Sequence, residues 1–432
     1  MRPNWISQNN YWQAYLLPPT AQKAPPFQGG DEWAYLMGRD GLGALLPFDI
    51  CSTLCDNAHM RKMFQYRLFP HKKQVQKLNE TLEECRWLYN HLLGTRKTAY
   101  EERGESLSLY QQQETFSILK TERSSLKAVH SQILQNVAVR VELAFKAFFR
   151  RVRAHAEDPG YPRFKGYGRY DSFTFPQSGF SITHDNRIVL SKIGTLKMVY
   201  HRPMKGKVKT CTIHRSSTGK WYVSFSVECE LERLPETPTQ VGIDVGLKTF
   251  ATLSTGEEIE NPRFFRKEEK ALAHVQRKHA KLAKGTPQRR KHRKVIARVH
   301  ERIAFRRDNF THQESRQIVD RFGVICVEDL QVNRMVHNHC LAKSIADASW
   351  TAFFAQLSSK AEEAGRAFVK VNPAYTSQTC SICGHRQKMP LDVRVLDCPC
   401  CHVQLDRDLN AAYNIRGLGL QALGLSVEAP RL

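Results

Sequence analysis

The chain has 432 residues, 41% of them hydrophobic, which is enough for several domains with sizeable cores and excludes an intrinsically disordered protein. Lys and Arg number 65 against 42 Asp and Glu, and the net charge of +23 predicts a polyanionic partner, either nucleic acid or an anionic membrane surface. Neither a membrane-spanning apolar run nor a secretory signal is apparent, so the 12 cysteines are expected in a reducing compartment, as thiols or metal ligands.

The N-terminal half is expected to contain four segments. Residues 1–60 have Pro and Gly clusters and little periodicity, and no structure is predicted for this extension. The run at 61–71 is strand-like and stops near a proline. Over 72–155 apolar residues recur at helical spacing, as in QVQKLNETLEECRWLYNHLL, which predicts a helical domain. Over 156–237 the segments are short, alternating and punctuated by glycine, which predicts an antiparallel sheet or small barrel.

The next part, 238–376, is expected to combine strands and helices. VGIDVGLKTFATL predicts two strands joined by a tight turn, and RFGVICVEDL predicts a buried strand that ends in acids. Between them, 263–310 is basic and helical and is interrupted by Gly-Thr-Pro, which predicts a helical hairpin. The remaining segments are a cysteine-rich stretch (377–403), a helix (404–417) and a tail (418–432).

Three carboxylates stand out in this part of the chain: Asp244, Glu328 and Asp408. The first two lie at the ends of short apolar strands, where Gly242 and Gly246 flank Asp244 and permit close approach of backbone or substrate. Carboxylates that converge from distant points suit Mg²⁺ or Mn²⁺, and two such ions can promote phosphodiester hydrolysis. Each acid alone could simply end a strand or cap a helix, but their order on a basic chain is typical of an RNase H-like nuclease core.

Two CxxC pairs provide a second candidate metal site. Cys380 with Cys383, and Cys398 with Cys401, are separated by a short spacer. This paired spacing predicts a tetrahedral zinc ribbon with four cysteine ligands. Its role would be structural, because so short a segment cannot bury a core of its own, and its last strand would lead the chain to Asp408.

Two basic regions are candidate nucleic-acid contacts. In the predicted hairpin the cations recur around the helix surface with few compensating acids, which favours phosphate binding over a merely solvated surface. The run YPRFKGYGRYDSFTF interleaves cations with aromatics, which suits stacking and phosphate contact but is equally compatible with a surface hairpin. The candidate residues are Arg289, Arg290, Lys291 and Arg293 in the hairpin, and Arg163 and Lys165 in the earlier run.

At these motifs the chain resembles TnpB, the protein of small bacterial and archaeal insertion sequences that is related to the type V CRISPR effectors. The resemblance spans residues 61–417 in the family's order. It rests on RLFPHKKQVQKLNETLEECRWLYNHLL, YPRFKGYGRYDSFTF, VGIDVGLKTFATLSTG, VICVEDL, SIADASWTAF, NPAYTSQTCSICGH and CPCCHVQLDRDLNAAYNI. The C-terminal motifs are the most specific, and the helical region is matched more loosely.

The resemblance implies an α+β multidomain protein. Its parts would be a helical recognition lobe, a β-barrel wedge domain and a RuvC-type (RNase H-like) α/β nuclease domain with an inserted four-cysteine zinc ribbon. Asp244, Glu328 and Asp408 would be the catalytic ligands of Mg²⁺ or Mn²⁺. Asp408 is preferred to Asp406 because the family's aspartate stands two residues before an asparagine, here Asn410.

The implied activity is RNA-guided DNA cleavage. A non-coding RNA from the element's end would direct the protein to matching double-stranded DNA beside a short flanking motif, in the bacterial or archaeal cytoplasm with the nucleoid and away from membranes. Gln135 fits the family's helix as a nucleic-acid contact, whereas Ser131 and Gln132 diverge and leave the flanking motif open. Two alternatives also stay open: a transposase that uses the same acids for strand transfer, and a non-cleaving RNA- and DNA-binding regulator.

Overall fold

The computed structural model describes residues 59–390 and 393–426. The expected extension, 1–60, lies outside this range except for its last two residues, which begin the first strand. Within the described ranges, no helix has both the length and the apolar character that a bilayer crossing requires.

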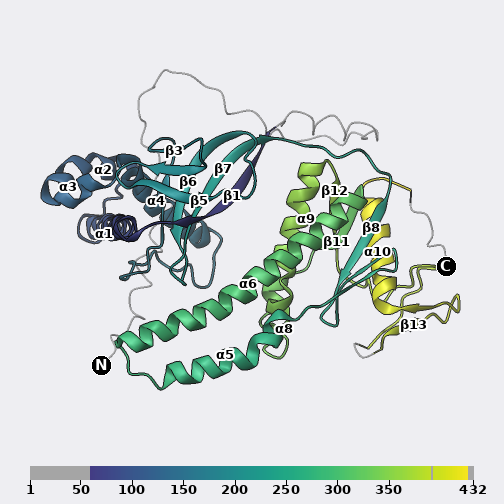
Figure 1. The fold of residues 1–432 in the computed structure, drawn as a ribbon. Coiled ribbons are helices and arrows are strands. Elements are labelled where there is room, and N and C mark those ends of the chain that lie inside the picture. Colours follow the sequence, from purple (N-terminus) through teal and green to yellow (C-terminus); the bar gives the residue numbers. More distant parts are fainter. Residues whose placement is uncertain (1–58, 391–392, 427–432) are drawn as a thin grey trace, which may run out of the picture. The chain divides into compact units, whose positions relative to one another are not determined.

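A seven-stranded antiparallel sheet organises the residues up to 230 (Figure 1), in the order β2-β6-β7-β1-β5-β4-β3. Its strands are β1 (His59–Phe69), β2 (Ser172–Phe175), β3 (Phe180–Ile182), β4 (Arg187–Leu190), β5 (Gly194–Val199), β6 (Lys207–Arg215) and β7 (Trp221–Glu230). β1 pairs with β7 and β5, so a strand that precedes the helices in sequence lies inside the sheet. Buried and less buried residues alternate along β7, and the sheet is a nearly closed barrel, as the sequence pattern predicted.

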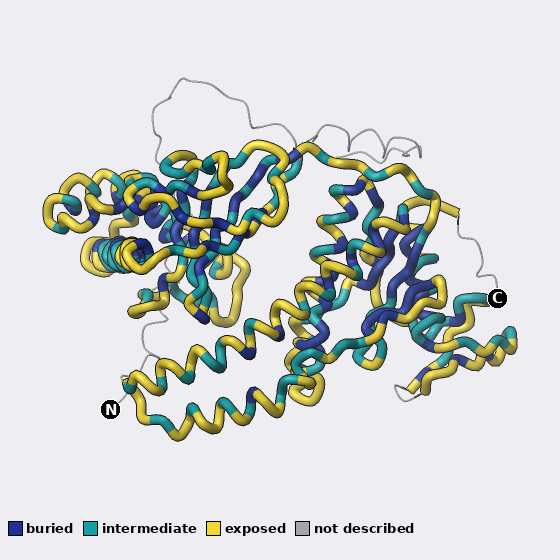
Figure 2. Tube along the Cα trace, viewed as in Figure 1, coloured by how far each residue is buried: buried dark blue, intermediate teal, exposed yellow. Residues whose placement is uncertain are grey.

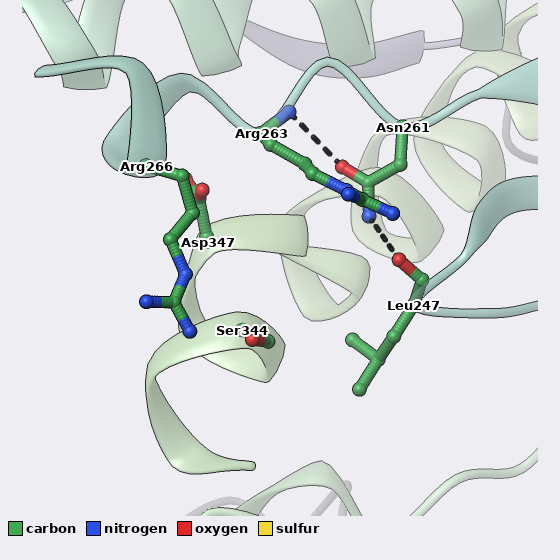
Figure 3. A pocket seen from close by; sticks show the side chains of 6 residues that line it. All are labelled: Leu247, Asn261, Arg263, Arg266, Ser344 and Asp347. Carbon is green, nitrogen blue, oxygen red and sulfur yellow. Dashed lines mark hydrogen bonds between the residues drawn. The ribbon is translucent and has the colours of Figure 1, made fainter.

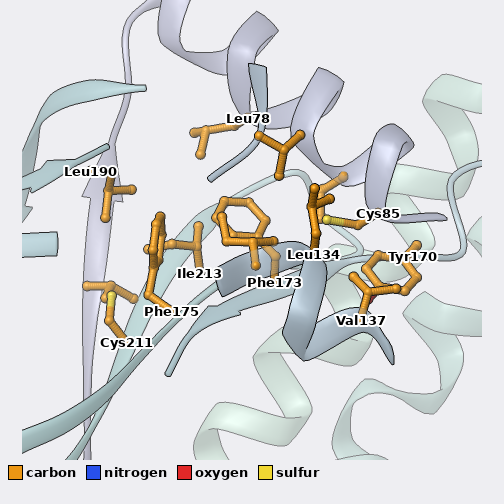
Figure 4. Close-up of a cluster of buried hydrophobic side chains, with 14 of the residues drawn as sticks. Leu78, Cys85, Leu134, Val137, Tyr170, Phe173, Phe175, Leu190, Cys211 and Ile213 are labelled. Atoms are coloured by element: carbon orange, nitrogen blue, oxygen red, sulfur yellow. The ribbon is translucent and has the colours of Figure 1, made fainter. Parts of the chain in front are cut away.

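The helices that follow β1 pack against this sheet. They are α1 (Lys72–Arg103), α2 (Leu109–Glu114), α3 (Phe116–Glu122), a 3-10 turn (Ser124–Ala128) and α4 (Ser131–Arg153). Leu78 and Cys85 of α1 and Leu134 of α4 are buried in one cluster with Phe173 and Phe175 of β2 (Figure 4). The helical spacing of apolar residues in the sequence therefore corresponds to the faces that contact the sheet.

A mixed five-stranded sheet organises the residues from 240 onward, in the order β10-β9-β8-β11-β12. The strands are β8 (Gln240–Val245), β9 (Thr249–Leu253), β10 (Glu258–Glu260), β11 (Val324–Glu328) and β12 (Ala367–Val371). β8, β9 and β10 pair antiparallel, whereas β8, β11 and β12 are parallel. Parallel neighbours end at the same edge of a sheet, so this order brings residues that are distant in sequence to one edge.

Successive residues of β8 point to opposite faces of this sheet. Val241 and Ile243 enter the core that includes residues of α6 (Pro287–Arg321) and α9 (Trp350–Ala364). Gly242 faces α10 (Arg407–Ala422) so closely that a Cβ on it would collide with the carbonyl oxygen of Ala412. The small residues around the acidic motifs thus allow helix and strand to meet at backbone distance, as the sequence suggested for Gly242.

α5 (Phe264–Ala280) and α6 form the predicted basic hairpin. Exposed residues cover much of it (Figure 2), and its own small core contains Leu272, Val299 and Ile303. Thr286 caps α6 by accepting a hydrogen bond from the backbone N–H of Arg289 at 3.2 Å. α6 continues past the predicted hairpin end at residue 310, because its last turns are buried against the five-stranded sheet.

The cysteine-rich segment has little regular structure. It contains a two-stranded sheet of β13 (Val395–Asp397) and β14 (Gln404–Asp406), and α10 follows β14 directly. Its buried apolar cluster consists of two cysteines, Met389 and Leu396. So small a core cannot hold a fold by itself, which favours a metal as its cross-link. Short helices α7 (Val332–Met335) and α8 (Ala342–Ala348) lead from β11 to α9.

Candidate active site and cysteine cluster

Neighbouring strand ends bring Asp244 and Glu328 together. β8 and β11 pair Ile243 with Val327, and the next residue of each strand is the carboxylate. Gly242, two residues before Asp244, faces α10, so strand alternation places Asp244 on the α10 side of the sheet as well. The two acids therefore lie side by side at the edge where α10 begins.

The first turn of α10 supplies the third carboxylate. Asp406 is its N-cap and accepts hydrogen bonds on Oδ1 from the backbone N–H groups of Asp408 at 2.8 Å and Leu409 at 3.0 Å. This carboxylate is used to cap the helix, whereas the Asp408 carboxylate forms an ion pair with Arg394 at 3.6 Å. The geometry thus supports the choice of Asp408 over Asp406.

The electrostatics of Asp244 link the three acids. Its carboxyl pKa is raised well above the usual value, first by desolvation and then by the charges of Glu328 and Asp408. Desolvation also raises the pKa of Glu328 and of Asp408, and the nearby guanidinium of Arg394 opposes the rise for Asp408. Like charges held together in this way call for a cation between them.

The three carboxylates fit a divalent cation in chemistry, because hard cations such as Mg²⁺ prefer carboxylate oxygen ligands. Among the described residues, only the cysteine cluster brings three or more possible ligand atoms within 4.8 Å of one another. The three carboxylates do not form such a group, so contact of all three with one ion would require side-chain adjustment. Two ions about 3.5–4 Å apart could share such a site more readily.

The four predicted zinc ligands are gathered in space. The sulfur atoms of Cys380, Cys383, Cys398 and Cys401 all lie within 4.8 Å of one another. Two of the S···S distances are 3.6 Å and 3.5 Å, close to the roughly 3.8 Å that a tetrahedron with Zn–S bonds of about 2.3 Å requires. The backbone N–H of Cys401 hydrogen-bonds to the Cys398 sulfur and lowers its pKa to about 6, which favours the thiolate that a metal needs. These residues fit a structural metal ion.

The nucleic-acid candidates of the N-terminal half are at the surface. Gln135 is exposed on α4, and Arg163 is exposed in the loop before β2. The backbone of Lys165 is fixed by both side-chain atoms of Asn90, which accept from its N–H at 2.7 Å and donate to its carbonyl at 2.9 Å. Two residues on, Tyr167 is 88% exposed. The loop therefore presents cations and an aromatic ring on an anchored backbone.

The hairpin candidates separate into two groups. Arg290, Lys291 and Arg293 are exposed and available to a phosphate. Arg289 is partly buried, and its guanidinium donates a hydrogen bond to the carbonyl of Leu282. Arg289 therefore fastens the hairpin turn, a role that the count of cations in the sequence did not distinguish.

A polar cavity of about 390 Å³ lies where α5 begins (Figure 3). It is lined by Leu247, Asn261, Arg263, Arg266, Ser344 and Asp347. Asn261 joins two of its walls, donating to the Leu247 carbonyl at 3.0 Å and accepting from the Arg263 N–H at 3.1 Å. Arg307 neutralises Asp347 at 2.7 Å. The cavity is thus cationic, and it adjoins the turn three residues beyond Asp244.

Two residues at the site were missed by sequence reasoning. Arg263 lies in the cavity, but in the sequence it is one of many cations. Thr376 is 5% exposed, and its hydroxyl donates to Glu328 Oε1 at 2.6 Å. The only available signal for Thr376 was its position between the last sheet strand and the first cysteine, and a lone threonine has no pattern that predicts a partner.

Three family profiles match the chain. Residues 223–339 match one described as "Probable transposase", and residues 350–415 match one described as "Cas12f1-like, TNB domain". Residues 60–105 match one described as "Helix-turn-helix domain". In the structure this last range forms β1 and the single helix α1.

The chain is also similar to proteins that are named as RNA-guided or CRISPR-associated nucleases. It is 34% identical to a putative RNA-guided DNA endonuclease of Streptomyces pristinaespiralis, over 84% of this chain and 90% of that protein. It is 31% identical to one named InsQ from Escherichia coli, over 85% and 95%. It is 30% identical to a CRISPR-associated endodeoxyribonuclease, Cas12f1, of Sulfoacidibacillus thermotolerans, over 53% and 58%.

A solved structure shares the fold. The cryo-EM structure of a Cas12f1–sgRNA–target DNA complex matches with a TM-score of 0.53 and 15% sequence identity, over 80% of this chain and 83% of that one. The likeness at this identity concerns the α+β architecture alone. The family profile and the sequence relatives both agree with the motifs. The chain therefore belongs to the TnpB (OrfB) family that those motifs predicted.

Proposed function

We propose that this protein is a transposon-associated RNA-guided DNA endonuclease with a RuvC-type, RNase H-like catalytic domain. The convergence of Asp244, Glu328 and Asp408 from β8, β11 and α10 is the observation that carries the proposal. A mixed sheet with a strand-end acid on each of two parallel neighbours, and a third acid on the helix packed across them, is the arrangement that the RNase H-like reading requires. The names of the relatives supply the guided activity.

The three carboxylates would hold divalent ions at the scissile phosphate. When bound, two such ions supply an activated water and stabilisation of the leaving 3′ oxygen. The chain's own residues fix the ligands. The parallel pairing of β8 with β11 places Asp244 beside Glu328, and the Asp406 cap sets the start of the helix that carries Asp408. Arg394 beside Asp408 moderates the negative charge of the site.

A guide RNA and double-stranded DNA are the proposed partners. Base pairing would read the target sequence, while the protein binds the backbone and a short flanking motif. The exposed cations Arg290, Lys291 and Arg293 and the cationic cavity with Arg263 support a polyanionic partner on the nuclease side of the chain. The helices and the seven-stranded sheet of the N-terminal half form the proposed recognition and wedge domains. In these domains the candidate nucleic-acid contacts are Arg163, Lys165 and Gln135.

Zinc is the proposed occupant of the cysteine cluster, with a structural role. The four sulfur atoms lie within 4.8 Å of one another, and four cysteine ligands would fill a tetrahedral zinc ion and leave no position for a substrate. The cluster lies in the chain between β12 and α10, so it would hold the connection that delivers Asp408.

The proposal is tested by co-expression with the RNA encoded downstream of the gene. The purified complex is given Mg²⁺ and plasmids that carry a guide-matched target beside a randomised flank. We expect double-strand breaks at the target that require guide and flank. Joined rather than cut products would favour strand transfer, and target binding without cutting would favour a regulator; either result would overturn the endonuclease proposal.

A further inference from the structure

Thr376 contacts Glu328 from outside the sheet. Its hydroxyl oxygen lies 2.6 Å from Glu328 Oε1 and 3.3 Å from the carbonyl of Pro373. A hydroxyl has one proton, and the shorter distance assigns that proton to the carboxylate. Both side chains are buried, with 5% of Thr376 and 8% of Glu328 exposed, so water does not compete freely for this bond.

The loop that carries Thr376 leaves the sheet at the end of β12 and returns to the end of the neighbouring strand, β11. β12 ends at Val371, which is the register partner of Glu328. The chain then leaves the sheet and comes back five residues later with the Thr376 hydroxyl. A backbone hydrogen bond from Asp329 N–H to the Val371 carbonyl at 2.8 Å fixes the start of the loop.

The end of the loop is held by α10, the helix that carries Asp408. Asn414 Nδ2 donates to the carbonyls of Thr376 at 2.8 Å and Thr379 at 2.7 Å. Asn410 is fully buried, donates to the Thr379 carbonyl at 2.8 Å and accepts from the Ser381 N–H at 2.9 Å. The two asparagines are four residues apart and so lie on one face of the helix.

We propose that Thr376 is a positioning residue for Glu328, and that the loop 372–379 clamped by Asn410 and Asn414 fixes the spacing between Glu328 and Asp408. This inference deepens the proposed function and rests on it. The hydroxyl engages Oε1 and leaves Oε2, which has no hydrogen bond to the described residues, to face a metal ion. The cysteine cluster begins at Cys380, directly after this loop ends, so a metal ion held by the cluster would anchor the same loop.

The hydroxyl acts by fixing the position of the carboxylate. The hydrogen bond that it donates to Glu328 Oε1 holds the side chain in one rotamer, so that less entropy is lost when a metal binds. Groups that orient metal ligands in this way typically contribute about 10–100-fold to metal affinity.

The test replaces the hydroxyl and restores it. Thr376→Val removes the donor with little change in volume, and Thr376→Ser keeps it. Thr379→Val is the matched control, because the Thr379 hydroxyl donates to the Tyr375 carbonyl at 3.1 Å in the same loop without contact to Glu328. Should Thr376→Val fold poorly, Thr376→Ala and Thr376→Ser differ by the hydroxyl alone and supply the same comparison.

Mn²⁺ binding is measured on the full zinc-loaded chain without nucleic acid, from the electron paramagnetic resonance signal of free Mn²⁺. We expect Thr376→Val to weaken the Asp244-dependent Mn²⁺ site about 10-fold or more, with Ser restoring it and Thr379→Val unchanged. In cleavage assays the half-saturating Mg²⁺ concentration should rise in parallel, while target binding is retained.

Two results would overturn the inference, and they are distinguishable. If Thr376→Val binds Mn²⁺ as the parent protein does, the hydroxyl does not position Glu328, and the proposed function is unaffected. If the parent protein has no Mn²⁺ site that Asp244→Ala abolishes, the carboxylates are not a metal site, and both the proposed function and this inference are wrong.

Discussion

Asp244, Glu328 and Asp408 lie in surroundings that disfavour their charged forms. Each has a raised pKa, chiefly through desolvation, and Asp244 also experiences the charges of the other two. A carboxyl whose pKa is raised on folding keeps a proton that the unfolded chain releases. The unfolded state then binds fewer protons, so the free energy of unfolding falls as pH rises above the ordinary carboxyl range toward the raised values. Without divalent ions, the acids therefore destabilise the fold at neutral pH.

Asp244→Asn should consequently stabilise the protein when divalent ions are absent. In Mg²⁺-free buffer at pH 8, with zinc retained, we expect a higher Tm than that of the parent, on the order of 2–4 °C for each kcal/mol of relieved repulsion. At pH 4 the difference should shrink, because the parent's carboxyls are then protonated. Thermal melts at the two pH values check this, and a lower Tm for Asp244→Asn at pH 8 would contradict it.

At the level of single residues, the sequence predicted the positions of those candidate site residues that lie at the ends of strands. The short apolar runs in VGIDV and VICVE predicted that Asp244 and Glu328 lie at strand ends, and their proposed roles remain predictions. Thr376 and Arg289 were not predictable, because the first depends on the path of a loop and the second on the fold of a turn. Neither path is encoded in a local pattern.

Elements position the site through close packing of α10 on β8. Gly242 has no side chain between the two, and any Cβ there would overlap the Ala412 carbonyl. On the same helix, a Cβ on Gly419 would collide with the Cys326 sulfur of β11. The position of Asp408 relative to the strand-end acids therefore depends on these two glycines.

Gly242→Ala should displace α10 and lower both activity and stability. Overpacking of this kind costs about 1–3 kcal/mol, and we expect a loss of cleavage larger than the loss of folded protein at the assay temperature. Urea unfolding and single-turnover cleavage measure the two effects. Gly94→Ala is the control: it lies within α1, its Cβ would meet only the Phe164 ring at 3.8 Å, and alanine favours a helix. Equal activity of Gly242→Ala and the parent would contradict the account.

The hairpin makes a separate prediction about salt. Neutralising Arg290, Lys291 and Arg293 together should reduce the slope of log Kobs for target DNA against log salt by about 2–3, since each lost B-DNA phosphate contact removes about 0.9. Binding of the guide-loaded complex is measured between low and physiological salt. Lys205→Gln is a control, because the Lys205 amine pairs with Glu232 at 2.6 Å. An unchanged slope for the triple variant would show that these three residues do not contact the phosphates of the target DNA.

Element types and order were largely predictable, and their extents less so. The hairpin was expected because Gly-Thr-Pro separates two helical runs, and the structure has α5 and α6 on either side of it. Its second helix was predicted to end at 310 but reaches Arg321, since burial of Ile318 and Val319 extends it into the core. That burial depends on contacts with residues distant in sequence, so the spacing of polar and apolar residues along the helix could not reveal it.

In the whole molecule, the cysteine cluster joins two parts of the proposed active site. The chain passes from β12 through the Thr376 loop into the cluster, and from the cluster through β14 into α10. A structural metal there would stabilise both connections. The architecture of the family was predictable from the motifs and their order along the chain. The connection between the cysteine cluster and the acidic residues was not, because it depends on contacts between residues that are distant in sequence.

Metal analysis tests this role. The purified protein should contain one zinc per chain by mass spectrometry, and Cys398→Ser should lose most of it, with a lower Tm and weakened cleavage. Cys400→Ser is the matched control, because Cys400 is exposed and outside the four-sulfur set. Full zinc content in Cys398→Ser, or zinc loss in Cys400→Ser, would show that the ligand assignment is wrong.

The most direct test of the account compares cleavage by single carboxamide variants of the guide-loaded complex. Asp244→Asn, Glu328→Gln and Asp408→Asn keep the shapes of their side chains and remove the charge. The control is Asp329→Asn, next to Glu328 in sequence and paired with Lys370 at 3.4 Å. We predict that the three site variants bind target DNA as the parent does but cut at least about 10³-fold more slowly, and that Asp329→Asn cuts normally. A site variant that cuts at the parent rate would contradict the claim that these three carboxylates form the catalytic centre.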